Sequence, residues 1–157
     1  MKIDQVKVGR GILGLCALPG RGGDYAGDLL VLRNFAPAAV LSLVQIQEYP
    51  RHNAPTMIRD LAALAIPQIH FPIRDFGTPS AALWPSVSAR LHVILGAGER
   101  VLIHCLAGCG RTGTLALRLM VEAGEGPAEA LIRLRAARPC AVETRAQEIW
   151  ASRKVGL

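Results

Sequence analysis

Apolar and polar positions divide the first 105 residues into alternating strand-like and helix-like segments. Short apolar runs, typical of buried strands, lie at 12–18, 39–44, 68–73 and 100–105. Apolar residues recur at helical spacing in the intervening segments 25–36, 55–65 and 82–97. Successive short strands joined by helices favour a sheet whose strands run mostly parallel. We therefore predict an α/β fold with a central mixed, mostly parallel sheet flanked by helices.

The chain beyond residue 110 is expected to be entirely helical, with helices at 111–123, at 127–138 and near 144–154. The first of these is apolar nearly all round, which is typical of a buried central helix. Pro127 and Pro139 delimit the second, and Ile149 and Trp150 are expected to face inward from the third. No repeat or linker interrupts the pattern, so we predict a single domain over residues 1–157.

Composition narrows the classes of partner. Hydrophobic residues make up 51% of the 157 residues, and the formal net charge of +6 favours anionic partners. Basic residues form no run interleaved with aromatics, which makes nucleic acid an unlikely partner. No segment approaches the roughly 20 apolar residues that span a bilayer, so no membrane partner is expected. The four cysteines do not form a disulfide framework, which makes a reducing cytoplasm the default location.

The sequence HCLAGCGRTG at 104–113 joins the last predicted strand to the central helix. A turn containing Gly108 and Gly110 can direct consecutive backbone N–H groups toward one anion. The helix that follows adds unpaired N–H groups and the positive end of its dipole. Cys105, at the base of this turn, is therefore expected to act as a thiolate nucleophile. The phosphate would be held by Leu106, Ala107, Gly108, Cys109, Gly110 and Arg111.

Two side chains after the turn complete the predicted phosphate site. The planar guanidinium of Arg111 matches two phosphate oxygens, and the Thr112 hydroxyl is placed to hydrogen-bond the departing thiolate. The simpler alternative is a buried structural cysteine beside a glycine turn. A lone cysteine would favour that alternative, but cysteine, two glycines, arginine and threonine at these offsets favour catalysis. His104, directly beside Cys105, could not easily share a tetrahedral zinc site with it. As a strand-end residue, His104 is expected to support the loop by hydrogen bonds rather than to carry protons.

Thiolate attack on a phosphate monoester needs a proton donor for the leaving oxygen, and Asp75 is the candidate. It follows the predicted strand 68–73, so it should reach the same sheet edge as Cys105. Alternatively Asp75 caps the next helix, and an ion pair with Arg74 would oppose its role as an acid. Asp75 is also expected to activate water in the second step. The Gln147 side chain is an amide that could orient this water, although spacing alone does not identify it.

These segments resemble the Cys-x5-Arg protein-tyrosine/dual-specificity phosphatases. HCLAGCGRTG is similar to their phosphate-binding loop and FPIRDFGTP at 71–79 to their general-acid loop. RPCAVETRAQ at 138–147 resembles the segment that carries a water-positioning glutamine, which supports Gln147. Together with GLCALPG at 14–20, the segments are closest to kinase-associated phosphatase-like dual-specificity enzymes. The resemblance implies a dual-specificity phosphatase-like fold, no metal and no organic cofactor.

The resemblance also implies a phosphorylated protein as the substrate, with phosphotyrosine and phosphoserine or phosphothreonine entering a shallow pocket. Several alternatives remain: a phosphatase of RNA 5′ ends or of phosphoinositides, a sulfur-transfer or arsenate-reducing enzyme, and a non-catalytic phosphoprotein-binding module. The absence of a basic residue at positions 106 and 107 disfavours a phosphoinositide. The sequence does not indicate an oligomeric state.

Two minor features have competing interpretations. Cys109 or Cys140 could trap an oxidised Cys105 as a disulfide, although we favour both as small packing residues. The arginines of the segment 133–138 could form a basic rim for phosphopeptides, or simply a solvated helix face.

Overall fold

The computed structural model describes residues 1–153 and contains one five-stranded sheet in the order β1-β2-β5-β3-β4. β1 (Asp4–Val8) runs antiparallel to β2 (Gly11–Ala17). The other neighbours are parallel and include β3 (Ala39–Ser42), β4 (Gln68–His70) and β5 (Arg100–Cys105). The predicted central mixed, mostly parallel sheet is therefore confirmed. The sequence pattern missed β1, whose five residues are partly exposed at the sheet edge.

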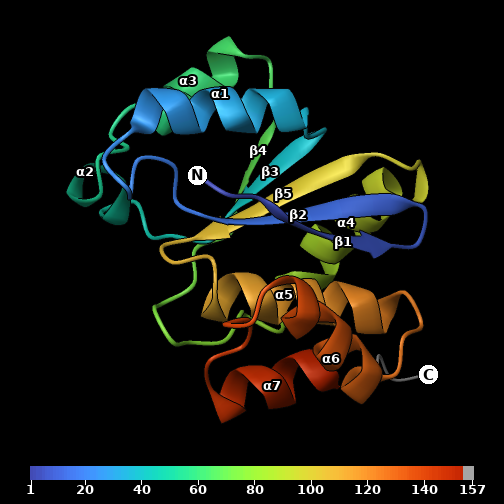
Figure 1. Ribbon diagram of the computed structural model, residues 1–157. Helices are drawn as coiled ribbons and strands as arrows, with labels where there is room; N and C mark the ends of the chain where they lie inside the picture. The colour runs from blue at the N-terminus through green and yellow to red at the C-terminus, as the bar shows by residue number, and fades with distance from the viewer. Residues whose placement is uncertain (154–157) are drawn as a thin grey trace.

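Helices cover both faces of the sheet (Figure 1). One face carries α1 (Tyr25–Phe35), the short α2 (Glu48–Arg51) and α3 (Met57–Ala63). The other face carries α4 (Trp84–Gly96), α5 (Gly110–Glu122), α6 (Pro127–Ala137) and α7 (Arg145–Ser152). Successive β5 residues supply both layers: Leu102 packs with α1 and α3, whereas Val101 and Ile103 pack with α4 and α5.

The predicted helices are present within a few residues of their expected bounds, and residue 154 of the last prediction lies outside the described residues. α5 is buried nearly all round, as its apolar sequence indicated. The inward orientation of Ile149 is wrong, since this side chain is 45% exposed, whereas Trp150 is buried. Within residues 1–153, no helix combines the length and apolar character needed to cross a bilayer.

Candidate active site

The phosphate loop, defined as residues 105–111, connects the end of β5 to the start of α5. β5 is the central strand, so the loop emerges at the middle of the carboxyl edge of the parallel strands. Cys105 is 2% exposed, and the Gly108 N–H points at its sulfur with an N–S distance of 3.2 Å. Leu106, Ala107 and Cys109 are partly exposed around it. The loop thus directs at least one backbone donor at the sulfur.

Glycine at two loop positions permits close contact with neighbouring segments. Gly108 has a φ of 71°, and an added Cβ would lie 2.3 Å from the carbonyl oxygen of Cys16 in β2. At Gly110 an added Cβ would lie 2.2 Å from a carboxylate oxygen of Glu143 and 3.0 Å from the Gln147 amide nitrogen. A larger residue at position 108 would therefore push the loop away from β2, whereas one at position 110 would displace the Glu143 side chain.

Arg111 is 1% exposed and is held by carboxylates and a carbonyl. Its Nη1 and Nη2 donate to the two carboxylate oxygens of Glu48 at 2.9 and 3.0 Å, and Nη1 also donates to the Ile73 carbonyl at 3.1 Å. Within residues 1–153 its Nε has no hydrogen-bond partner. The guanidinium is therefore fixed on the edge formed by its two Nη atoms, whereas its Nε donor is unused among the described residues.

Glu48 is a site residue that sequence analysis missed. Burial acts to raise the pKa of Glu48, but hydrogen bonds from Arg111 and from the Gln45 amide outweigh it, so the pKa lies below its ordinary value. Glu48 thus stays ionised opposite the guanidinium. It begins the four-residue helix α2, which no motif marks. The available signal was its position after β3, a strand that ends at the same sheet edge.

Asp75 lies on the acid loop, defined as residues 71–80, and its carboxylate reaches Arg111. The distance from Asp75 Oδ1 to Arg111 Nη2 is 3.2 Å, and the side chain is 53% exposed. The anticipated pairing with Arg74 is therefore replaced, among the described residues, by pairing with Arg111. Asp75 does not cap the next helix, because α4 begins only at Trp84. The acid loop and the phosphate loop therefore meet at one guanidinium.

Gln147 is fully buried between the two loops. Its Oε1 accepts hydrogen bonds from the backbone N–H groups of Glu143 and Thr144, at 3.0 and 3.2 Å. Its Nε2 donates to the Gly77 carbonyl of the acid loop at 3.2 Å. Gln147 thus links the start of α7 to the acid loop and lies beside Gly110 of the phosphate loop.

The hydroxyl of Thr112 does not form the expected contact with Cys105. Thr112 is fully buried, and its Oγ1 has no hydrogen-bond partner within residues 1–153. The predicted hydrogen bond from Thr112 to the thiolate is therefore not formed in this structure.

A buried polar layer supports the end of β5. His104 Nε2 lies 2.7 Å from Ser42 Oγ, and Gln68 Nε2 donates to the same oxygen at 2.7 Å and to the Tyr49 hydroxyl at 3.0 Å. Burial lowers the pKa of His104 to about 4, so the imidazole is neutral near pH 7. His104 therefore supports the neighbouring strand, as expected.

Cys109 and Cys140 form a disulfide with each other, with their Cα atoms 5.2 Å apart. Our preference for two separate packing residues is therefore wrong. The connection between α6 and α7, residues 138–144, returns to the phosphate loop, so Cys140 lies near the loop as expected, but it bonds to Cys109. Among the described residues the free thiols are Cys105 and Cys16, and burial raises the pKa of Cys16. In this state neither Cys109 nor Cys140 can trap an oxidised Cys105.

Replacement of Cys140 by serine is expected to lower the free energy of unfolding by about 3.5 kcal/mol, because the disulfide closes a long loop in the unfolded chain. The paired cysteines are 31 residues apart in sequence. Urea unfolding with and without dithiothreitol measures this: the reductant should destabilise the parent protein and leave Cys140→Ser unchanged. Equal stability of the oxidised parent and the variant would contradict the prediction.

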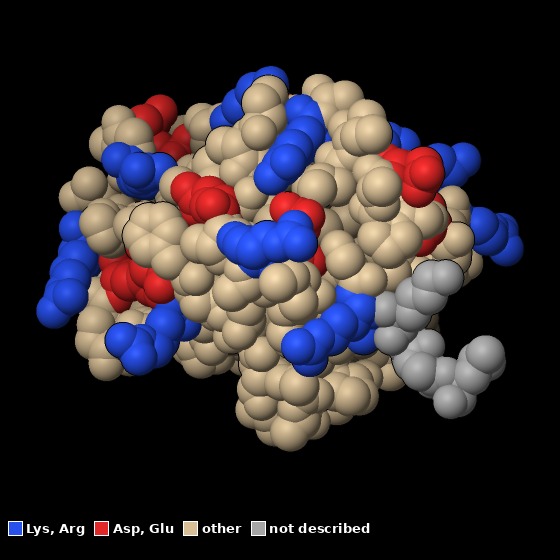
Figure 2. Space-filling model, turned by 90° about the horizontal axis from the view of Figure 1, so that it is seen from below, with Lys and Arg blue, Asp and Glu red and all other residues tan. Residues whose placement is uncertain are grey.

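The two α6 arginines lie on an exposed face, as expected, and both also pair with neighbouring groups. Arg133 pairs with Glu125, and Arg135 donates to the carbonyls of Ala141 and Val142. Figure 2 shows Lys and Arg on the lower face of the molecule scattered among acidic and uncharged residues. Within residues 1–153, no group of three or more His, Cys, Asp or Glu side chains is arranged to hold a metal.

Comparison with known proteins agrees with this geometry. Residues 25–125 match the family described as the DSP-PTPase phosphatase of polymorphic toxin systems. Cyclin-dependent kinase inhibitor 3 of Sus scrofa is 28% identical over 130 residues, covering 78% of this chain and 61% of that protein. The Homo sapiens protein of the same name gives the same identity and coverage. The chain thus spans less than two thirds of the length of these curated relatives.

Two solved structures are similar throughout most of the fold. Kinase-associated phosphatase, with its catalytic-site cysteine replaced by serine, matches with a TM-score of 0.86 at 24% identity, covering 96% of this chain and 92% of that chain. Tk-PTP in its active form matches with a TM-score of 0.73 at 29% identity, covering 88% and 87%. With its Cys-x5-Arg loop at the carboxyl edge of this sheet, the chain belongs to the DSP-PTPase family of cysteine-dependent phosphatases.

Proposed function

We propose that the chain is a protein phosphatase that hydrolyses phosphotyrosine, and also phosphoserine and phosphothreonine, through a phosphocysteine intermediate on Cys105. The observation that carries the proposal is the convergence on one loop of a sulfur facing a backbone N–H, an arginine with a free donor, and a carboxylate. Each group has a distinct task in phosphoryl transfer, and the family match supports the same chemistry.

In the first step, the Cys105 thiolate attacks phosphorus while the bond to the leaving oxygen breaks. Asp75, protonated, gives its proton to that oxygen. The loop N–H groups and Arg111 stabilise the charge on the transferred phosphoryl oxygens. In the second step, water attacks phosphorus and loses a proton to the Asp75 carboxylate. The Cys105 sulfur then departs as a thiolate, with Gln147 orienting the water and Thr112 able to rotate toward the sulfur.

The ion pair between Asp75 and Arg111 suggests how binding prepares the acid. A phosphate bound through Arg111 Nε competes with the Asp75 carboxylate, which pairs with Nη2, for the charge of the same guanidinium. Substrate binding thus converts Asp75 from an ion-pair partner of Arg111 into the proton donor for the leaving oxygen.

We propose a phosphorylated protein as the partner, a single catalytic domain over residues 1–157, and a cytoplasmic location. A reducing compartment suits a free Cys105, and there the disulfide at the exposed Cys140 would be accessible to cellular thiols. The partly exposed Leu106 and Ala107 supply no cation for the additional phosphates of an inositide.

A substrate panel tests this function. We expect vanadate-sensitive hydrolysis of p-nitrophenyl phosphate, and higher kcat/KM for phosphotyrosine and phosphothreonine peptides than for phosphoinositides or RNA 5′-triphosphates. Preference for RNA or an inositide would replace the proposed substrate class. Binding of phosphopeptides without any turnover would instead indicate a phosphoprotein-binding module.

Asp75→Asn is expected to reduce kcat about 100-fold on an alkyl phosphate, because a poor leaving group depends on protonation. The loss should be much smaller on p-nitrophenyl phosphate in the first step, which single-turnover kinetics can isolate. Glu99→Gln, at an exposed carboxylate by the amino end of β5, is the matched control and should leave both rates unchanged. An equal loss on both substrates would remove Asp75 as the acid.

A further inference from the structure

Arg138, just after α6, contacts the backbone of the phosphate loop and has no role in the proposed mechanism. Its side chain is 13% exposed and lies against the outer side of the phosphate loop. Nη2 donates to the Ala107 carbonyl at 2.8 Å, and Nε donates to the Gly108 carbonyl. Nη1 donates to Asp4 Oδ2 in β1 at 2.8 Å. Each of the three guanidinium nitrogens therefore donates a hydrogen bond, and two of them donate to the loop backbone.

The contact with Ala107 is connected to the nucleophile through a single peptide unit. The Ala107 carbonyl and the Gly108 N–H belong to the same planar trans peptide, so they point in opposite directions. Arg138 holds the carbonyl end, and the N–H end lies 3.2 Å from the Cys105 sulfur. The Gly108 carbonyl likewise shares its peptide with the Cys109 N–H. Holding both carbonyls outward therefore turns two N–H groups toward the sulfur side of the loop.

A cation on the carbonyl does more than orient the peptide. It polarises the peptide unit and makes the opposite N–H a stronger donor, as in any chain of hydrogen bonds. The effect is useful here because loop N–H groups must meet negative charge on sulfur and then on phosphate. Asp4 keeps Arg138 in place: burial acts to raise the pKa of Asp4, but hydrogen bonds from Lys2 and Arg138 outweigh it and lower the pKa.

We propose that Arg138 is a positioning residue of the phosphate loop, which binds the carbonyls of Ala107 and Gly108 so that the N–H groups of Gly108 and Cys109 face the sulfur and the phosphate. This inference rests on the proposed phosphatase function. It assigns Arg138 to the loop backbone rather than to a substrate, because each of its three guanidinium nitrogens already donates to a protein oxygen and two of these oxygens are loop carbonyls.

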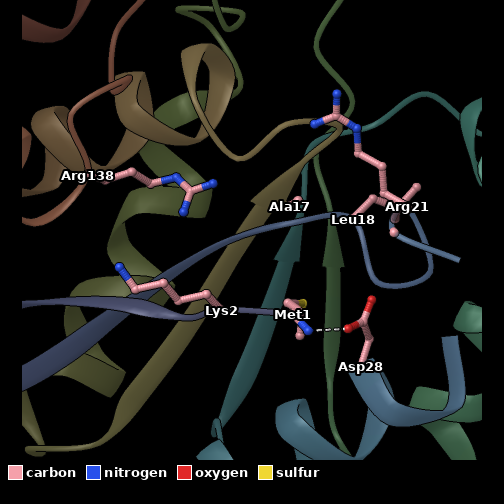
Figure 3. A pocket seen from close by; sticks show the side chains of 8 residues that line it. Met1, Lys2, Ala17, Leu18, Arg21, Asp28 and Arg138 are labelled. Atoms are coloured by element: carbon pink, nitrogen blue, oxygen red, sulfur yellow. Dashed lines mark ion pairs between the residues drawn. The ribbon is translucent and has the colours of Figure 1, made fainter. Parts of the chain in front are cut away.

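A surface hollow gives access to this contact. A cavity of about 410 Å³ is lined by Arg138 together with Lys2, Arg21 and Asp28 among others. Figure 3 shows the Arg138 side chain extending into this region from one side, with Lys2 below it and Arg21 on the opposite side. A small cation entering the hollow can therefore reach the position that the guanidinium would vacate in a truncated variant.

Arg138→Ala tests the proposal against Arg133→Ala, a control within the preceding helix α6 whose side chain pairs with Glu125. We expect kcat/KM for p-nitrophenyl phosphate to fall about 10- to 100-fold in Arg138→Ala, the range seen when residues that orient metal ligands are removed. The vanadate inhibition constant should rise by a similar factor. Millimolar guanidinium should restore part of the activity of Arg138→Ala, and Arg138→Lys should lie between the parent and the alanine variant. Arg133→Ala should match the parent in every assay.

Amide hydrogen exchange separates this inference from the proposed function. Peptides covering residues 104–113 should exchange faster in Arg138→Ala than in the parent, while peptides from α1 and α3 exchange equally. That comparison decides the positioning role even if the parent hydrolyses no phosphate ester, a result that would defeat the function alone. A folded Arg138→Ala with parental exchange in residues 104–113 would overturn the inference. So would parental kcat/KM and vanadate inhibition in an active protein, or a loss that guanidinium and Arg138→Lys both fail to recover.

Discussion

Cys105→Ser is expected to lower kcat for p-nitrophenyl phosphate at least about 10⁵-fold, the scale on which loss of a nucleophile acts. A serine hydroxyl at this position stays protonated near neutral pH, and the phosphate loop contains no general base to remove its proton. Oxygen in place of sulfur changes little in volume, so the loop N–H groups and Arg111 should still bind a phosphate mimic. Steady-state kinetics and tungstate binding by calorimetry measure the two properties separately.

The matched control for this variant is Cys16→Ala, at the other free thiol of the described residues. Cys16 lies in β2 opposite His104 and packs toward α1, on the other face of the sheet from Cys105. Its loss should affect stability and leave turnover near the parental value. Residual activity of Cys105→Ser within a factor of about 100 of the parent would end the nucleophile assignment, because removal of a true nucleophile lowers kcat far more than that.

The sequence pattern was sufficient for most of the fold because each central strand is buried on both faces. Such strands appear as continuous apolar runs, and the helices between them keep their own period. β1 was not predicted because an edge strand needs no continuous apolar run. α2 was not predicted because four residues are too few to show a helical period. Ile149 was misplaced because α7 buries Gln147 and Trp150, and a polar residue at a buried position shifts the apparent apolar face.

Some residues of the candidate site could likewise be predicted from the sequence, and others could not. Cys105 and Arg111 belong to one contiguous loop, and Asp75 follows from the rule that parallel strands end at one sheet edge. The roles of Glu48 and Arg138 could not be predicted from the sequence, because they depend on tertiary contacts. Glu48 contacts the Arg111 guanidinium, and Arg138 contacts backbone carbonyls of the phosphate loop. The Cys109–Cys140 disulfide depends on the return of the α6–α7 connection to the loop, and cysteine spacing does not determine it.

Arg111→Lys is expected to lower kcat/KM about 1,000-fold, at the upper end of the cost of removing one preorganised donor. Arg111 uses two nitrogens on Glu48 and keeps Nε for the phosphate, a division that a single ammonium cannot reproduce. The lysine ammonium is instead expected to pair with Glu48 alone. The vanadate inhibition constant should therefore rise together with the loss of turnover.

Glu48→Gln distinguishes the orientation of Arg111 from its charge. Because glutamine can accept one hydrogen bond from the guanidinium but lacks the second carboxylate oxygen, we expect a loss of about tenfold, smaller than that of Arg111→Lys. The two losses should not add in the double variant, since lysine has no fork for Glu48 to hold. Additive losses, or an Arg111→Lys protein with parental vanadate inhibition, would show that the guanidinium does not bind the phosphate and that Glu48 acts on another part of the site.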